Sequence, residues 1–175
     1  NRLRNGLCEH YYESGQILRK WYYKDNFLIG STKMYYKNGQ LKHIDNYKDG
    51  MKNGLSISYY ENGQINFKIN YNGSGYENGL FEEYYENGQL NIKTIKKNGL
   101  KNGLYEWYFK NGQLGYKKYY KDGKLDGLFE EYHENGQLKQ KLLYKDDEII
   151  LNYRSVIGDT NIEDWFCLKK ILLGN

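Results

Sequence analysis

The chain repeats one short segment six times at a nearly constant interval. In the third copy the segment reads Tyr59-Tyr60-Glu61-Asn62-Gly63-Gln64-Ile65, and the glycines of the six copies stand at positions 15, 39, 63, 88, 112 and 136. The steps between them are therefore 24, 24, 25, 24 and 24 residues. A fixed period of this kind is typical of a repeat array, in which each unit buries its apolar surface only against its neighbours. We therefore expect a scaffold with a long surface rather than an enzyme built around one pocket.

Each repeat has the pattern of a β-hairpin. In the third copy, residues 55–60 have a six-residue strand pattern, and residues 65–71 alternate between apolar and polar side chains. The Asn-Gly pair between them favours a two-residue type I′ turn, which would pair Tyr60 with Ile65 and Ser58 with Phe67. A second turn follows, as at Asp49-Gly50, and a second glycine, such as Gly54, then opens the next strand. Six such units predict an elongated, single-layer antiparallel β-meander of tandem 24-residue hairpins.

The expected sheet has two unequal faces. With the turn placed as above, the more apolar face carries, in the third and fifth copies, Tyr60, Ile65, Phe67, Ile69, Tyr71, Tyr105, Trp107, Phe109, Leu114, Tyr116 and Tyr120. The other face mixes Leu55, Ile57 and Tyr59 with Asn66, Lys68 and Asn70. A slip of one residue would exchange the two faces, so the assignment of residues to faces stays open at this point.

The repeat pattern ends near residue 147, which divides the chain into a repeat array (1–147) and a C-terminal cap (148–175). Residues 148–153 could form one last strand, and Thr160-Asn161-Ile162-Glu163 matches the capping box that begins a helix. We expect a helix over residues 161–173 that covers the open end of the sheet, because repeat arrays need terminal caps. In the alternative interpretation, Trp165, Phe166 and Leu172 of this helix dock on a partner.

Composition limits the functional classes. The chain has 175 residues, a net charge of +4 and 21 tyrosines, and this aromatic content argues against disorder. It has no block of like charges and no run of 18 apolar residues, so neither a basic arm nor a transmembrane helix is expected. Cys8 and Cys167 fall at opposite ends of the array and are expected to be free thiols. The chain begins at Asn1 rather than Met, so localisation stays open between the cytoplasm and, if a signal is missing, export to the cell surface.

A search for catalytic or cofactor motifs finds none. The three histidines, His10, His43 and His133, fall in copies one, two and six, so they are not expected to share a site. There is no nucleophile-elbow or phosphate-loop motif, and residues 122–127 lack the spacing of a calcium loop. Lysine and tyrosine interleave, but glutamate between them weakens the pattern of a nucleic-acid interface. We expect no enzyme activity, no cofactor, no metal and no nucleic-acid partner.

The repeated unit, Y-Y-x-N-G-Q-L followed by Y-K-D-G-K-x-N/D-G-L, resembles MORN repeats, and most closely the bacterial variant found in YwqK-like antitoxin proteins. The resemblance covers residues 5–145. It implies hairpins laid side by side in an elongated twisted sheet. It also implies a role as an antitoxin or immunity protein, or as an exported surface protein; eukaryotic relatives are linked to membrane attachment and scaffolding.

These arguments together predict a noncatalytic protein-binding scaffold, with a toxin as the expected partner and steric occlusion as the mechanism. The alternatives are an exported surface protein that engages a receptor on host or neighbouring cells, and a scaffold that binds lipid headgroups. Tyrosine and tryptophan are frequent interface anchors, so the candidate partner-binding residues are Tyr36, Tyr60, Phe67, Tyr85, Tyr105, Trp107, Phe109 and Tyr116. The alternative role of each is to stack across strands and hold the sheet together.

Overall fold

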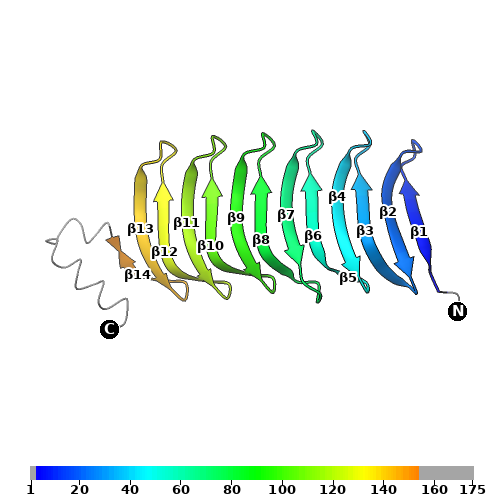
Figure 1. Ribbon diagram of the computed structural model, residues 1–175. Helices are drawn as coiled ribbons and strands as arrows, with labels where there is room; N and C mark the ends of the chain where they lie inside the picture. The colour runs from blue at the N-terminus through cyan, green and yellow to red at the C-terminus, as the bar shows by residue number, and fades with distance from the viewer. Residues whose placement is uncertain (1–2, 154–175) are drawn as a thin grey trace.

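In the computed structural model, which describes residues 3–153, the chain folds into one antiparallel sheet of 14 strands. The strands lie side by side in chain order (Figure 1), apart from the short β5, which pairs with β4. The predicted all-β meander is therefore confirmed. The strands are β1 (Gly6–Tyr11), β2 (Ile17–Lys24), β3 (Phe27–Tyr35), β4 (Leu41–Lys48), β5 (Met51–Lys52), β6 (Gly54–Tyr59), β7 (Ile65–Tyr71), β8 (Glu77–Tyr84), β9 (Leu90–Lys97), β10 (Leu100–Tyr108), β11 (Leu114–Lys121), β12 (Lys124–Tyr132), β13 (Leu138–Lys145) and β14 (Glu148–Asn152).

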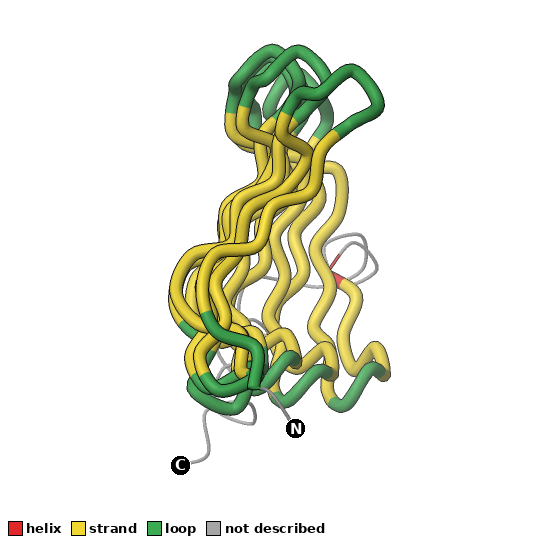
Figure 2. Tube along the Cα trace, turned by 90° about the vertical axis from the view of Figure 1, so that its right-hand side faces the viewer, coloured by secondary structure: helices red, strands yellow, loops and turns green. Residues whose placement is uncertain are grey.

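The sheet is a single layer whose turns gather along two edges and whose strands bow along their length (Figure 2). Within residues 3–153 no second layer of strands or helices covers either face. The most buried side chains nevertheless concentrate on one face, where they pack against their neighbours on adjacent strands: Thr32, Asp45, Ser56, Ser58, Ile69, Thr94, Tyr105 and Leu142. The core of this protein is thus one densely packed surface of the sheet rather than an interior.

The Asn-Gly turn differs from the prediction. In the third repeat the Tyr60 amide donates to the Gln64 carbonyl at 2.8 Å, and the Gly63 amide donates to the Tyr60 carbonyl at 3.0 Å. The loop therefore has three residues, and only Gly63 has a positive φ, of 86°, as in a type I turn followed by a glycine bulge. Ser58 pairs with Phe67 as predicted, but Ile65 pairs with Tyr59 rather than Tyr60. Ile65 therefore belongs to the opposite face from the one predicted.

The type I′ geometry occurs instead at the second turn of the repeat. Asp49 and Gly50 both have positive φ, 50° and 81°, and they join the paired residues Lys48 and Met51. The step of 25 residues arises at this turn in the third repeat. There the amide of Gly75 donates to the carbonyl of Asn72 at 2.9 Å in a three-residue loop. The extra residue is absorbed in the turn, and the strands β7 and β8 pair on both sides of the local bulge.

The second glycine of the repeat marks a bulge, and in β3, β8, β10 and β12 it lies inside the strand instead of opening it. In β12, residues 126–128 lie opposite Tyr119 alone, because Lys118 pairs with Phe129 and Tyr120 with Leu125. Gly127 at the centre of this bulge has φ of 130°, and a Cβ there would lie 2.9 Å from the Cβ of Tyr119. Both the backbone angle and the close approach therefore require glycine.

Side chains of the Asn-Gly-Gln turn join the middle repeats to one another. The Asn62 carbonyl oxygen accepts a hydrogen bond from the Gln64 amide at 2.9 Å, and its Nδ2 donates to the Glu86 carbonyl of the next repeat at 3.0 Å. The side-chain carbonyl of Gln64 lies over the glycine of the next turn, 3.0 Å from where a Cβ would stand on Gly88. The recurring asparagine and glutamine are therefore inter-repeat contacts, and the turn motif is architectural.

At the C-terminal end, the predicted last strand is confirmed as β14, which pairs with β13. The predicted helix over residues 161–173, its residues Trp165, Phe166 and Leu172, and Cys167 lie outside the described residues. Cys8 carries a free thiol, as predicted. No helix in the described part of the chain is long and apolar enough to cross a membrane.

Candidate functional site: the aromatic face

The pairing register divides the side chains between two faces, because residues directly opposite in an antiparallel pair lie on the same face. One continuous row runs across seven strands through Ile69, Phe81, Thr94, Tyr105, Lys118, Phe129 and Leu142. A neighbouring row on this face contains Trp107 paired with Tyr116. We call this side of the sheet the aromatic face.

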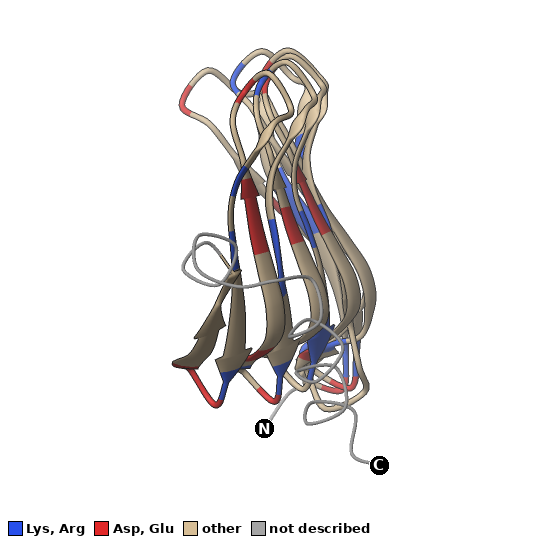
Figure 3. Cartoon of the chain, turned by 90° about the vertical axis from the view of Figure 1, so that its left-hand side faces the viewer, with Lys and Arg blue, Asp and Glu red and all other residues tan. Residues whose placement is uncertain are grey.

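The opposite side is a ladder of alternating charges, which we call the ladder face. Figure 3 shows the bands of acidic and basic residues on neighbouring strands. Lys68 pairs with Glu82 at 2.7 Å, and Glu130 pairs with both Lys117 at 2.7 Å and Lys141 at 2.9 Å. Burial acts to raise the pKa of Glu130, but these two lysines and the Tyr132 hydroxyl outweigh it and lower that pKa to about 2. Many of the charges on this face are therefore neutralised within the sheet.

Four of the predicted partner-binding residues come together on the aromatic face in the fifth repeat. The ring of Trp107 meets Phe109 edge-on at 4.7 Å between centroids and stacks on Tyr116 at 5.3 Å. Tyr105 stacks in turn on Tyr116 at 5.9 Å. Tyr105 is only 6% exposed, whereas the other three rings are half-buried. Tyr105 is thus a packing residue of the group, and the exposed ring surface belongs to its neighbours.

A glycine makes room for this group. Gly115 follows the fifth turn, and a Cβ built on it would lie 2.1 Å from the Trp107 ring. The other five repeats have a larger residue at this position: Leu18, Lys42, Asn66, Asn91 and Lys139. Trp107 and Gly115 therefore form a matched pair found in one repeat only, and its signal in the sequence is the deviation of both from the repeat.

Three other candidates have an evident structural role. The Tyr36 hydroxyl donates to the Tyr59 carbonyl of the next repeat at 2.7 Å. The same bond joins Tyr60 to Tyr84 and Tyr85 to Tyr108, both at 2.7 Å. Burial raises the pKa of all three hydroxyls, which supports their role as donors. In the fifth repeat, Phe109 stands at this position and has no hydroxyl to donate.

The eighth candidate, Phe67, belongs to a separate group on the aromatic face. Its ring stacks on Phe81 at 6.2 Å and meets His43 at 5.8 Å. The eight candidates thus fall into three sets: a compact aromatic group in the fifth repeat, three tyrosines that join neighbouring repeats, and Phe67 on β7. Binding of a partner by these eight residues stays a prediction.

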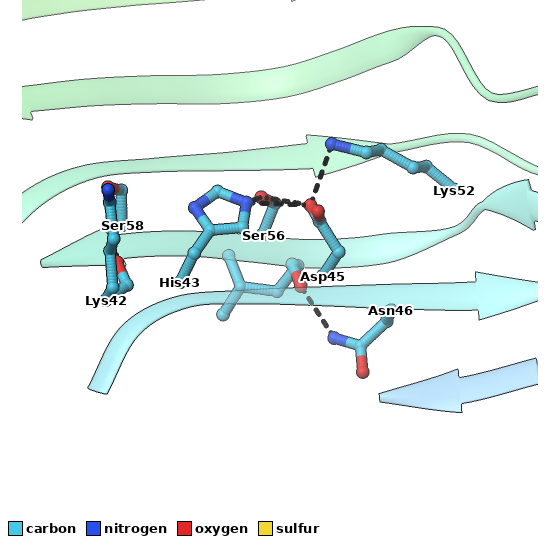
Figure 4. Close-up of polar contacts among 8 residues, drawn as sticks. Lys42, His43, Asp45, Asn46, Lys52, Ser56 and Ser58 are labelled. Carbon is cyan, nitrogen blue, oxygen red and sulfur yellow. Dashed lines mark hydrogen bonds and ion pairs between the residues drawn. The ribbon is translucent and has the colours of Figure 1, made fainter. Parts of the chain in front are cut away.

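A polar cluster that the sequence did not predict lies beside Phe67. We call it the Asp45 cluster; it consists of His43, Asp45, Lys52 and Ser56 (Figure 4). Asp45, 8% exposed, accepts a hydrogen bond from the Ser56 hydroxyl at 2.7 Å and pairs with Lys52 at 2.9 Å and His43 at 3.1 Å. Burial acts to raise the pKa of Asp45, but these three partners together hold it well below its usual range.

The Asp45 cluster contains serine, histidine and aspartate, but not in the arrangement of a catalytic triad. In a triad the aspartate and the serine bind opposite ring nitrogens of the histidine. Here both Asp45 and Ser56 contact Nε2 of His43, at 3.1 and 3.3 Å, and Ser56 is 1% exposed. The geometry suits a structural network. Within residues 3–153 no group of three His, Cys, Asp or Glu residues could hold a metal ion.

A second cluster that the sequence did not predict surrounds the aromatic group of the fifth repeat. We call it the Lys118 cluster; it consists of Lys101, Tyr105, Tyr116, Lys118 and Tyr120. The Lys118 ammonium lies 5.0 to 5.5 Å from the centres of all three rings. The Lys101 ammonium lies 4.5 Å from the Tyr105 ring and 5.1 Å from the Tyr120 ring. Burial, followed by the hydrogen bond with Tyr116, strongly raises the pKa of Tyr105.

The six hairpin units of this sheet identify the family of the chain. A family model described as the MORN repeat variant matches residues 4–25, 28–49, 52–72, 77–95, 101–122 and 125–146. The chain belongs to the MORN repeat variant family. Each match begins just before or within the strand that carries the second glycine and ends at or shortly before the second turn of the repeat, so one MORN unit corresponds to one hairpin of the sheet. A comparison with curated proteins found no match.

Proposed function

We propose that this MORN-variant chain is a noncatalytic protein-binding scaffold whose aromatic face binds a partner, and that the partner is a cognate toxin which the scaffold neutralises by covering it. The supporting observation is the exposed ring surface of Trp107, Phe109 and Tyr116 on a single-layer sheet. Aromatic residues held rigidly by neighbours are good interface anchors, because little conformational freedom is lost on binding. The resemblance of the repeat to YwqK-like antitoxins supports a toxin as the partner.

The ladder face is less suited to a strong interface. Several of its lysines and glutamates are already paired within the sheet, as Lys68 with Glu82 and Lys117 with Glu130. A partner would have to break such pairs or bury them, and burying charged groups costs free energy that the pairs only partly return. The ladder face also exposes apolar side chains, such as Leu80 and Ile95, which pair across β8 and β9 beside these charges. The aromatic face offers contiguous, stacked ring surface that gains from removal of water. This contrast favours the aromatic face as the binding surface.

Affinity capture tests the proposal. The tagged chain is used as bait in lysate of its native cell, and any captured protein is identified and co-expressed with the chain in a growth assay. Two substitutions on the aromatic face, Phe109→Ala and Tyr116→Ala, are compared with Leu80→Ala and Tyr119→Ala on the ladder face. Leu80 and Tyr119 are each 41% exposed, more than the half-buried Phe109 and Tyr116, so these controls remove apolar side chains that are at least as accessible to a partner.

The proposal expects a captured protein that is toxic alone, rescue of growth by co-expression, and weaker capture by the aromatic-face variants only. Loss of capture in the ladder-face variants instead would contradict the assignment of the face. A captured partner that is not toxic would contradict the antitoxin role, whereas the proposed protein-binding scaffold would stand. Sedimentation of the wild-type chain with anionic vesicles, abolished by the aromatic-face substitutions, would replace the protein partner with a lipid surface.

A further inference from the structure

The Lys118 cluster holds two cations on the same part of the aromatic face. Both ammonium groups lie within 5.5 Å of the centres of the Tyr105 and Tyr120 rings. Within residues 3–153, neither lysine forms an ion pair with any carboxylate. Glu83, an acid that acts electrostatically on Tyr105, accepts a hydrogen bond from Asn91 at 2.9 Å. The two ammonium groups therefore lie over the same tyrosine rings, and neither has a counter-ion in the described part of the chain.

Other charges on the same face are neutralised by direct partners. Asp45 is bound by Lys52, and Glu77 is bound by Lys96. At the other end of the sheet Arg19 lies 5.1 Å from the centre of the Trp21 ring and Arg4 lies 5.8 Å from that of Tyr23, so these two cations lie over different rings. The Lys118 cluster is therefore the place on the aromatic face where positive charge is concentrated.

The rings hold the two ammonium groups in place without using up their hydrogen-bonding capacity. A cation over an aromatic ring is attracted by the negative face of the ring, and an ammonium carries three N–H donors, which a ring face satisfies poorly compared with a carboxylate oxygen. Lys101 and Lys118 are both half-buried, so their long side chains have lost part of their freedom before any ligand arrives. An anion would therefore meet donors that are already positioned.

We propose that the Lys118 cluster is a binding site for carboxylate groups of an acidic segment of the protein partner, with apolar residues beside the acids. The carboxylates would lie between the ammonium groups of Lys101 and Lys118, and the neighbouring apolar residues would pack on Trp107, Phe109 and Phe129. Phe129 pairs directly with Lys118 across the strands, and Trp107 stacks on Tyr116 of the cluster. This inference rests on the proposed function, since it names what the aromatic face recognises.

A protein segment fits the surroundings better than a small anion does. Inorganic phosphate would use the two ammonium groups and leave the ring surfaces of Trp107 and Phe109 in water. Residues two apart in an extended segment point to the same side, so a segment with an acidic and an apolar residue at such positions presents the acid to the lysines and the apolar side chain to the rings. The combination of both contacts provides specificity for acid next to apolar residue.

The test uses the full chain and a short fluorescein-labelled peptide in which glutamate and leucine stand two residues apart, on the same side of an extended chain, titrated by fluorescence anisotropy. The double variant K101Q/K118Q removes the two cations, and K97Q/K121Q removes two exposed lysines at the ends of β9 and β11. A peptide with glutamine in place of glutamate controls for apolar binding. K101R/K118R keeps the charges and reports on any loss caused by packing alone.

We expect K101Q/K118Q to weaken binding of the acidic peptide by about tenfold, as two partly exposed ion pairs would, and K97Q/K121Q to stay within about twofold of wild type. K101R/K118R should bind nearly as well as wild type, and the glutamine peptide should bind no better to wild type than to K101Q/K118Q. Equal losses in both glutamine variants would overturn the site. Displacement of the peptide by millimolar phosphate, or pelleting with anionic vesicles that depends on these lysines, would replace the acidic segment by a small anion or a membrane.

Partner capture separates this inference from the proposed function. If K101Q/K118Q captures the natural partner as well as wild type while Phe109→Ala does not, the lysine site is wrong and the binding face stands. If the acidic peptide binds through these lysines but no protein partner is captured from the native cell, the site stands and the scaffold's proposed role fails.

Discussion

Asp45 and Lys118 occupy the same place in their repeats, six residues after the turn glycines Gly39 and Gly112, yet their surroundings differ. Asp45 is almost fully buried and is satisfied by His43, Lys52 and Ser56. Lys118 is held only by aromatic rings. One charge is therefore built into the structure, and the other remains available to a ligand. In this array the backbone is nearly the same in every repeat. The repeats differ in the side chains that stand at equivalent positions on the aromatic face.

The largest expected effect breaks the Asp45 cluster. Asp45→Asn removes the charge that compensates Lys52, so we expect the free energy of unfolding to fall by about 2–3 kcal/mol, as for other networks that lose one partner below the surface. Lys118→Gln should cost about 1 kcal/mol or less, because it loses only ring contacts. Urea denaturation of both variants measures the difference. Similar losses in the two variants would contradict the distinction between the clusters.

Acid should affect the same cluster. The folded state holds the pKa of Asp45 below its ordinary value of 3.8, so the stability that Asp45 contributes is present above that pH and is lost as pH falls through the folded pKa. Glu130, with a pKa lowered to about 2, should add a loss between about pH 4.5 and 2. Urea midpoints measured from pH 7 down to pH 2 should therefore decline below about pH 4.5. The decline should be shallower in Asp45→Asn, and an unchanged slope would argue against this role.

The packing of Trp107 over Gly115 can be tested in the repeat that contains Lys118. Gly115→Ala places a methyl group 2.1 Å from the Trp107 ring, so the ring must move, at a cost of about 1–3 kcal/mol. Gly73→Ala is the control, since nothing lies within 4 Å of a Cβ there and its φ is not in the left-handed region. Near-ultraviolet circular dichroism should change in Gly115→Ala and not in the control. An unchanged spectrum and urea midpoint would show that the ring does not depend on the glycine.

The smallest expected effect concerns the inter-repeat tyrosines. Tyr85→Phe removes the bond to the Tyr108 carbonyl and should cost about 1 kcal/mol. Phe109→Tyr places a hydroxyl in the equivalent position, facing the Tyr132 carbonyl by analogy, and should raise the free energy of unfolding by about 0.5–1 kcal/mol. Differential scanning calorimetry of the two variants should give shifts of opposite sign. A destabilised Phe109→Tyr would mean that the fifth repeat departs from the common geometry.

The regular part of the fold follows from the sequence because the signals recur six times. The hairpins, their order and the pairing of Ser58 with Phe67 are all as predicted. The turn type was wrong, because Asn-Gly satisfies both a type I′ turn and a type I turn with a glycine bulge. The same three-residue loop occurs at the sixth turn, which no further repeat follows in the described chain, so the choice is made within the hairpin: the Asn135 side-chain oxygen accepts a hydrogen bond from the Gln137 amide at 3.0 Å, as Asn62 does from Gln64.

The candidate site was predictable only in part. Trp107, Phe109 and Tyr116 are conspicuous in the sequence and do gather on one face. Some partners of Asp45 and Lys118, such as Lys52, Ser56 and Tyr105, come from neighbouring strands, so these contacts depend on a register that the sequence leaves open. The available signal was the exchange of residue type at one repeat position: Trp21, Asp45, Ile69, Thr94, Lys118 and Leu142.

The central claim is that the aromatic face, and not the ladder face, binds the partner. Hydroxyl-radical footprinting of the complex tests it directly, because it reports the exposure of individual aromatic side chains. The account predicts that Trp107, Phe109 and Tyr116 become protected on binding, while Tyr22 and Tyr119, which are 48% and 41% exposed on the ladder face, stay unchanged. Protection of Tyr22 and Tyr119 with Trp107 and Phe109 still reactive would contradict it.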